Sequence, residues 1–161
     1  MKQKITTFLT FDGDAEEAVD LYTSVFPNSR VREVTHYGEA GPRDAGMVMT
    51  VSFELDGQTF VGLNGGPDFT FNEATSFQID CSSQEEVDEY WSRLTDGGED
   101  GPCGWLKDRY GVSWQVVPSR LTELITESDA ETSQRVMAAM LQMRKIDIAA
   151  LEEAAAEGTR A

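Results

Sequence analysis

The sequence predicts an α+β fold in which two βαβββ modules form a curved mixed β-sheet, followed by a C-terminal helical extension. The first observation is an internal repeat: FLTFDGDAEEAVDLYTSVF, from Phe8, matches FQIDCSSQEEVDEYWSRL, from Phe77, at an offset of 69 residues. The second is that each copy begins as a strand and continues as an amphipathic helix. The third is that alternating strand patterns follow each helix, whereas the last forty or so residues show only helical spacing.

Both copies of the repeat carry the pattern of a helix start. Asp14 and Ser83 stand at the expected N-cap positions, and Glu17 and Glu86 complete a capping-box pattern three residues later. The acidic residues of these first turns are better explained by the helix dipole than by catalysis.

Strands are expected at residues 30–38, 46–57 and 58–66 of the first module, with a hairpin turn at Asp56-Gly57. In the second module, GGEDGP (97–102) is expected to be a loop, and CGWLKD and VSWQVVP form a hairpin. The paired modules, about 1–66 and 70–118, then make one domain of residues 1–118. Residues 119–161 form the helical extension, packed on this domain or on a dimer partner.

Within the extension, two helix starts are expected. Ser119 is the predicted cap of a short helix, and Ser128 with Glu131 forms a second capping-box pattern. A stripe rich in methionine follows at helical spacing, which is typical of core packing.

Composition and charge exclude several classes of function. The formal net charge of −16 opposes binding to nucleic acids and to anionic membranes. No apolar run approaches the roughly 18 residues that cross a membrane. The start, MKQKITTFLTFDGD, reaches acidic residues too early for a signal peptide, so we expect a cytoplasmic protein. Cys81 and Cys103 form no recognisable motif and are expected to be thiols.

The segment GWLKDRYGVSWQVVP (104–118) holds the richest candidate chemistry. Aromatic side chains and one amide, Gln115, suit the binding of a flat or apolar small molecule. Because side chains alternate along a strand, Trp114 and Gln115 face opposite sides, and we assign Trp114 to the core. His36, the single histidine, is a weak candidate for a general base, and an ordinary surface role explains it more simply.

The chain resembles the vicinal oxygen chelate superfamily, the fold of glyoxalases and extradiol dioxygenases. It is most similar to the PhnB-like branch, which is often labelled demethylubiquinone methyltransferase-like. The resemblance rests on FLTFDGDAEEAVDLYTSVFPNS, FTFNEATSFQIDCSSQEEVDEYWSRLTDGG, GPCGWLKDRYGVSWQVVP and QRVMAAMLQMRKIDIAALEEA. It implies a glyoxalase-like fold around a cleft, and a homodimer.

In metal-dependent relatives, each half gives two ligands, usually His, Gln or Glu, from its first and last strands. At those places this chain offers at most Glu73, Asn64 and Gln115, with Gln115 standing where relatives carry Glu. Hydroxyl and aliphatic side chains cannot replace the hydration shell of a divalent ion, so we expect neither metal nor cofactor. The expected ligand-binding cleft is lined by Thr7, Asn64, Ser76, Trp105 and Gln115.

Three functions stay open on this basis. The first is a metal-free small-molecule binding protein, and the second is a lyase, isomerase, transferase or dioxygenase acting on a small organic substrate. The third is a dimeric structural protein with a vestigial cleft. The methyltransferase label lacks support, because the glycine-rich LNGGPDF (63–69) is expected to lie between strands with no helix after it. The expected partners are a small molecule and a second copy of the chain.

Overall fold

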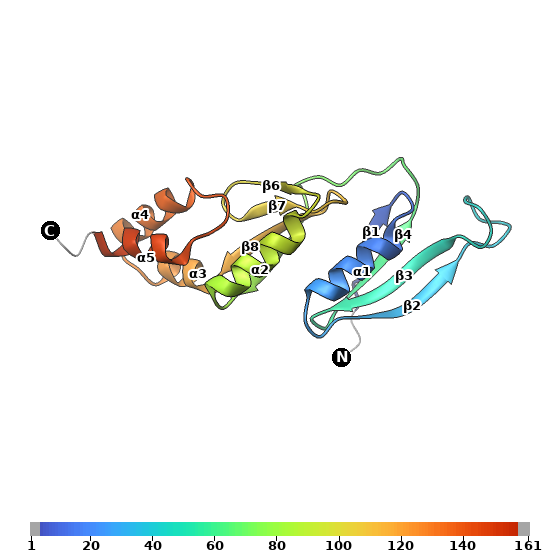
Figure 1. Cartoon of the computed structure of the whole chain (residues 1–161), viewed down its shortest axis with the longest axis horizontal. Helices are drawn as coiled ribbons and strands as arrows, with labels where there is room; N and C mark the ends of the chain where they lie inside the picture. Colours follow the sequence, from blue (N-terminus) through green and yellow to red (C-terminus); the bar gives the residue numbers. More distant parts are fainter. Residues whose placement is uncertain (1–3, 158–161) are drawn as a thin grey trace. The chain divides into compact units, whose positions relative to one another are not determined.

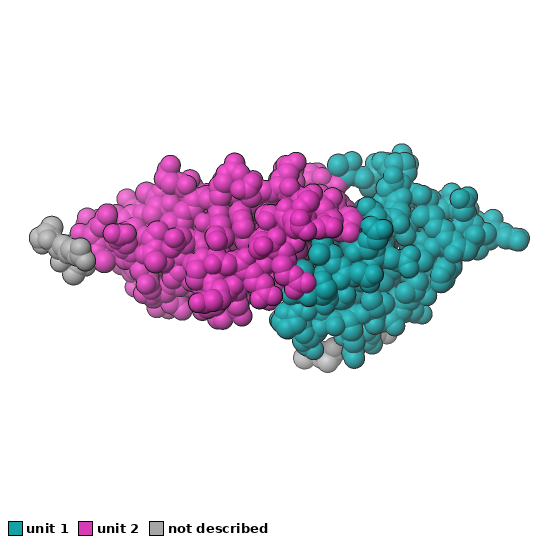
Figure 2. All heavy atoms as spheres, viewed as in Figure 1, with its two compact units in different colours: residues 1–70 teal, residues 71–161 magenta. Residues whose placement is uncertain are grey.

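The computed structural model describes residues 4–157 and divides the chain into two compact units, residues 1–70 and residues 71–161 (Figure 2). Each unit contains one four-stranded mixed sheet with a βαβββ order of elements (Figure 1). The expected α+β fold of two such modules is confirmed. Within residues 4–157, no helix is long and apolar enough to cross a membrane.

The first unit holds one helix against one face of its sheet. Its elements are β1 (Thr7–Phe11), α1 (Ala15–Val25), β2 (Arg30–His36), β3 (Val48–Leu55) and β4 (Gln58–Asn64). The strand order is β1-β4-β3-β2, in which β1 runs parallel to β4 and the other pairs are antiparallel. The β3–β4 hairpin turns at Asp56 and Gly57, both with positive φ, as the sequence predicts.

The core of the first unit lies between α1 and its sheet. Tyr22 is fully buried and stacks on Phe53, whose ring also stacks on Phe60 at a centroid distance of 5.5 Å. Asp14 is the N-cap of α1, but its side chain makes no capping hydrogen bond. The side chain of Asn64 does this instead, because its Oδ1 accepts the amide of Ala15 at 3.0 Å.

The second unit repeats this arrangement and adds three helices. Its elements are β5 (Ser76–Cys81), α2 (Gln84–Thr95), β6 (Glu99–Asp100), β7 (Trp105–Lys107), β8 (Ser113–Pro118), α3 (Ser119–Thr126), α4 (Ala130–Met140) and α5 (Ile148–Ala156). The strand order is β5-β8-β7-β6. The segment GGEDGP is therefore not all loop: Glu99 and Asp100 pair with β7, because glycine at position 98 lets the two backbones approach closely.

The helix caps of the second unit follow the sequence only in part. Ser83 caps α2 by accepting the amide of Glu86, as expected. The predicted caps Ser119 and Ser128 are wrong by one residue each, because α3 begins at Ser119 with Pro118 as its cap. Asp129 caps α4 and accepts two backbone amides at 3.0 Å, a role that a carboxylate performs as well as a hydroxyl.

The helical extension packs on the second module within one unit. Its own core consists of Leu121, Leu124, Val136, Ile146 and Leu151. The Gln84 amide, at the start of α2, donates to the carbonyl of Ile146 at 3.0 Å and accepts the amide of Ile148 at 2.9 Å. One side chain therefore ties the segment before α5 to the start of α2.

Candidate ligand site on the second sheet

The second sheet has one face packed against α2 and an opposite face that presents polar side chains and one tryptophan. Val116 and Trp114 are buried on the α2 side. By alternation, their neighbours point to the opposite face. The backbone register aligns these residues of β8 with residues of β5, β7 and β6, so that the side chains of this face form two rows across the strands. One row is Ser76, Ser113, Lys107 and Glu99, and the next is Gln78, Gln115 and Trp105.

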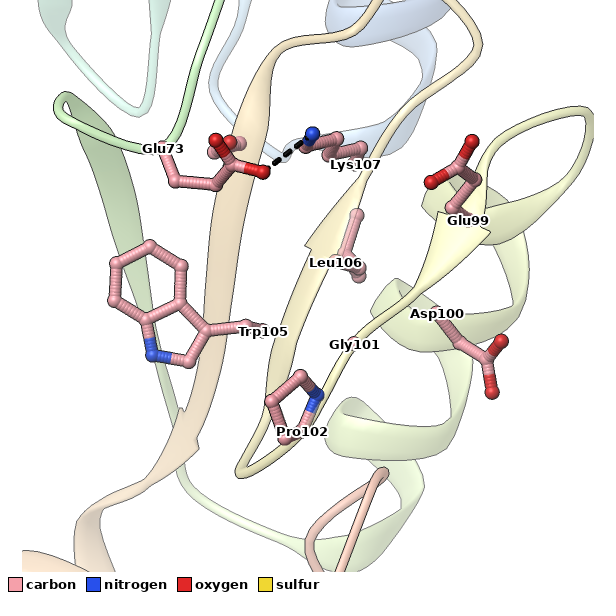
Figure 3. A pocket seen from close by; sticks show the side chains of 9 residues that line it. Glu73, Glu99, Asp100, Gly101, Pro102, Trp105, Leu106 and Lys107 are labelled. Carbon is pink, nitrogen blue, oxygen red and sulfur yellow. Dashed lines mark ion pairs between the residues drawn. The ribbon is translucent and has the colours of Figure 1, made fainter.

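A cavity of about 380 Å³ lies over this face of β7 and β8. Its lining consists of Glu73, Glu99, Asp100, Gly101, Pro102, Trp105, Leu106, Lys107 and Ser113. Figure 3 shows two different ends. Trp105 and Pro102 lie together at one end, and Glu73, Lys107 and Glu99 lie at the other. The cavity volume suits a small organic molecule.

The polar end of the cavity is organised around one ion pair. Lys107 Nζ lies 2.5 Å from Glu73 Oε1 (dashed line in Figure 3). The hydrogen bond from Lys107 lowers the pKa of Glu73, and the Glu73 carboxylate, helped by the charge of Glu99, raises the pKa of Lys107. Both groups therefore carry charge at neutral pH, and Lys107 is a charged donor rather than a base.

Ser113 contributes an unsatisfied hydroxyl to the cavity wall. The residue is only 2% exposed. Its Oγ has no hydrogen-bond partner within the described part of the chain. A buried hydroxyl without a partner costs about 1–3 kcal/mol, so a ligand group that bonds to Ser113 would recover this energy.

Three of the five residues expected in the cleft come together here. Gln115 Nε2 donates to Ser76 Oγ at 2.9 Å, and Trp105 stands opposite Gln115 in the strand register. Trp105 lines the cavity, whereas Ser76 and Gln115 lie beside it on the same face. The amide of Gln115 is therefore already engaged by a neighbouring side chain.

Thr7 and Asn64 belong to the first unit and do not share this face. Leu9 and Phe11 are buried against α1, as Ile79 and Cys81 are buried against α2. These residues therefore occupy equivalent positions, and the first strands of the two modules match at an offset of 70 residues. The helices match at 69, because the loop before α1 is one residue longer. A shift of one residue reverses the faces of a strand.

This shift corrects the expected roles of Thr7 and Asn64. By alternation, Thr7 shares the α1 side with Leu9. Asn64 is 1% exposed, and its amide donates to the carbonyl of Val48 at 3.0 Å while it caps α1. Asn64 is a structural residue, and the counterpart of Gln115 in the first module is Val61.

We expect the substitution Asn64→Leu to lower the free energy of unfolding by about 2 kcal/mol, because it leaves the buried amide of Ala15 and the carbonyl of Val48 without partners. Urea unfolding followed by circular dichroism measures this change. Asn72→Leu is the matched control, because Asn72 is exposed in a loop and its side chain accepts a single exposed amide, that of Ala74. Equal losses in both variants would contradict the capping role of Asn64.

The remaining chemical candidates lie away from the cavity. His36 is exposed on β2 of the first unit. Cys81 is buried on the α2 side of its sheet, and burial raises the pKa of its thiol to about 12, so the thiol stays protonated at neutral pH. Trp114 lies in the core as expected, and its Nε1 donates to Asp108 at 2.9 Å.

The strands that carry metal ligands in relatives supply few donors here. On the faces away from the helices, β1 and β4 present Phe8, Thr10, Val61 and Leu63. In the second unit, Gln115 is bonded to Ser76, and Glu73 is paired with Lys107. Within residues 4–157, no three His, Cys, Asp or Glu side chains gather as metal ligands. The residues present do not fit the metal centre of this fold.

Sequence reasoning missed most of the cavity lining, including Ser113, Lys107 and Glu99. Part of the signal was available. Strand alternation, which puts Gln115 and Trp114 on opposite faces of the sheet, also puts Ser113 on the same face as Gln115. It puts Lys107 on the same face as Trp105. The position of Glu99 could not be predicted from the sequence, because a two-residue strand next to two glycines has no periodic pattern.

Comparison with known proteins gives the family relationship. The sequence pattern of the family described as 3-demethylubiquinone-9 3-methyltransferase matches residues 3–117. The structure is similar to a putative 3-demethylubiquinone-9 3-methyltransferase, PhnB protein, from Bacillus cereus, with 39% identity and a TM-score of 0.65. That match covers 72% of this chain and 99% of the Bacillus chain. No curated protein sequence matches the chain at a significant level.

Two more distant structures share the fold. Protein PA1353 from Pseudomonas aeruginosa is 19% identical with a TM-score of 0.60, over 73% of this chain and 98% of that one. The fosfomycin resistance protein FosX from Listeria monocytogenes is 16% identical with a TM-score of 0.50, over 73% of this chain and 93% of that one. At these identities the likeness shows the fold alone.

Proposed function

Since the chain belongs to the 3-demethylubiquinone-9 3-methyltransferase family, a PhnB-like branch of the vicinal oxygen chelate superfamily, we propose that it binds a small organic molecule without a metal ion. The binding site is the cavity over β7 and β8 of the second unit. The family supplies the fold, and the side chains of this chain supply the argument for metal-free binding.

The observation that carries the proposal is the cavity of about 380 Å³ with an aromatic wall and an unsatisfied hydroxyl. Trp105 offers an apolar surface, and Ser113 offers a hydrogen bond that no described protein group uses. Together they provide affinity and orientation. A vestigial cleft would be filled by side chains, so the cavity favours binding over a purely structural role.

Catalysis is less well supported than binding. The ionisable groups of the cavity wall are Lys107 and three carboxylates, and Lys107 is held in its charged form by Glu73. The name methyltransferase gains no support from residues 63–69, because β4 ends there and β5 follows with no helix between them. A methyl donor bound at a glycine-rich loop normally lies between a strand and a helix N-terminus.

Nuclear magnetic resonance titration tests the proposal. Aromatic and heteroaromatic fragments are added to the ¹⁵N-labelled full chain in the presence of EDTA. We expect the backbone signals of Trp105, Lys107 and Ser113 to shift, and Trp105→Ala to weaken binding at least about 10-fold, as the loss of an aromatic contact surface predicts.

The matched control is Trp91→Ala, because Trp91 is a half-buried tryptophan of the same unit on α2. This variant should bind like the unmodified chain. Equal affinity for the fragments in the Trp105 variant, or signal shifts that depend on added Mn²⁺ or Zn²⁺, would contradict metal-free binding at this cavity. The predicted homodimer is a separate proposal. It is tested by measuring the molar mass of the protein by light scattering during size-exclusion chromatography.

A further inference from the structure

We propose that the cavity over β7 and β8 selects an aromatic amine, a molecule with a flat apolar body and a positively charged group, and rejects the corresponding anion. This inference rests on the proposed function and names the chemical class of its ligand. It is carried by four features of the cavity: a row of polar side chains, the charge at one end, a buried hydrogen-bond acceptor and an aromatic end.

The first feature is the row of polar side chains that crosses the sheet. The register places Glu99, Lys107 and Ser113 side by side on β6, β7 and β8, all on the face away from α2. Glu73, from the segment before β5, reaches the same end and pairs with Lys107 (Figure 3). These four side chains therefore form the polar end of the cavity.

The second feature is the charge of this end. Among residues 4–157, Lys107 is the only cation in the cavity lining, and Glu73 neutralises it at 2.5 Å. Asp100 is paired with Arg144 at 2.8 Å. Glu99 is then the one lining carboxylate left in excess, and its charge acts on Lys107. A bound cation balances this excess charge, whereas a bound anion adds a second uncompensated charge.

The third feature is the match of hydrogen-bond donors and acceptors. An ammonium group carries only donors. The Ser113 oxygen and the Glu99 carboxylate are both acceptors, and the Ser113 oxygen has no partner in the described chain. A carboxylate ligand would satisfy Ser113 as well, but it would face Glu73 and Glu99. Charge rather than hydrogen bonding therefore decides between the two ligand classes.

The apolar end explains why the ligand is aromatic. Trp105 and Pro102 lie together at this end of the cavity (Figure 3). An indole face packs well against another ring, and such pairs contribute about 0.5–1.5 kcal/mol beyond the area that they bury. The ligand accordingly has its ring at Trp105 and its charged group near Glu99 and Ser113.

Three probes with the same ring and different charge test the inference: 2-(2-naphthyl)ethylamine, 2-(2-naphthyl)ethanol and 2-naphthylacetate. Their affinities for the full chain are measured by isothermal titration calorimetry at pH 7 in the presence of EDTA. We expect the amine to bind about 5-fold more tightly than the alcohol, and the acetate to bind about 5-fold more weakly than the alcohol or not at all.

Two variants separate charge from general binding. Glu99→Gln should weaken the amine by up to about 5-fold, as expected for an exposed carboxylate, and leave the alcohol unchanged. Glu85→Gln is the matched control, because it removes the same charge from the exposed first turn of α2 and should change neither affinity. A Glu99→Gln variant that binds the amine as tightly as the unmodified chain overturns the inference.

The outcomes also distinguish this inference from the proposed function. Tightest binding by the acetate, or equal binding of all three probes at the cavity, overturns the amine class and leaves the binding function standing. If these three probes do not bind but other fragments shift the backbone signals of Trp105 and Ser113, the amine class is likewise overturned and the binding function stands. Failure of every probe and every fragment overturns both.

Discussion

Replacing Asp108 with alanine should lower the free energy of unfolding by about 3–5 kcal/mol, the largest effect that we expect from a single substitution in this chain. Asp108 is 2% exposed. Its Oδ1 accepts the amides of Tyr110 at 2.9 Å and Val112 at 3.1 Å, and its Oδ2 accepts Trp114 Nε1 at 2.9 Å. The alanine variant removes these three hydrogen bonds from the turn of the hairpin that carries Lys107 and Ser113.

Urea unfolding followed by tryptophan fluorescence measures this loss, because Trp114 reports directly on the hairpin. Asp96→Ala is the matched control. The side chain of Asp96 is 77% exposed and makes an ion pair with Arg109 at 2.8 Å, which is worth about 1 kcal/mol or less. Equal stabilities of the two variants would show that the Asp108 carboxylate does not hold the hairpin together.

The fold was predictable from the sequence because several local signals agree. The repeat, the alternation of residues 46–55 and the Asp56-Gly57 turn all indicate the same module, and each is a short-range property of the chain. The helix caps were less predictable. Asp14 occupies the cap position of α1, yet Asn64, fifty residues later, performs the capping. A local pattern cannot reveal a partner that only tertiary packing supplies.

The candidate site was predictable only where it follows strand alternation. Gln115, Ser76 and Trp105 lie on one face of the second sheet, as the alternation of residues along its strands predicts. Thr7 was expected in the cleft by the resemblance to the family, but one extra residue in the loop before α1 shifts the strand so that Thr7 lies on the α1 side of its sheet. The Glu73–Lys107 pair joins a loop to a strand over 34 positions, a distance at which the sequence holds no signal.

The edge of the cavity depends on a second structural feature, the close approach of β6 to β7. Gly98 precedes β6, and a Cβ atom at this position would lie 2.2 Å from the carbonyl oxygen of Lys107 and within 2.9 Å of two backbone atoms of Asp108. These neighbours are main-chain atoms and cannot rotate away, as the end of a flexible side chain can. Glycine is therefore required where β6 meets β7.

The substitution Gly98→Ala should accordingly lower the free energy of unfolding by about 3 kcal/mol and separate Glu99 from Lys107. Urea unfolding measures the first effect, and the shift of the Lys107 backbone amide signal in the folded variant measures the second. Gly38→Ala is the control, because a Cβ there meets no atom within 4 Å and its φ is not in the left-handed region. A Gly98→Ala variant as stable as Gly38→Ala, with an unchanged Lys107 signal, would mean that β6 does not lie against β7. The row of polar side chains in the cavity would then lose Glu99, and with it the excess negative charge on which selection of a cationic ligand depends.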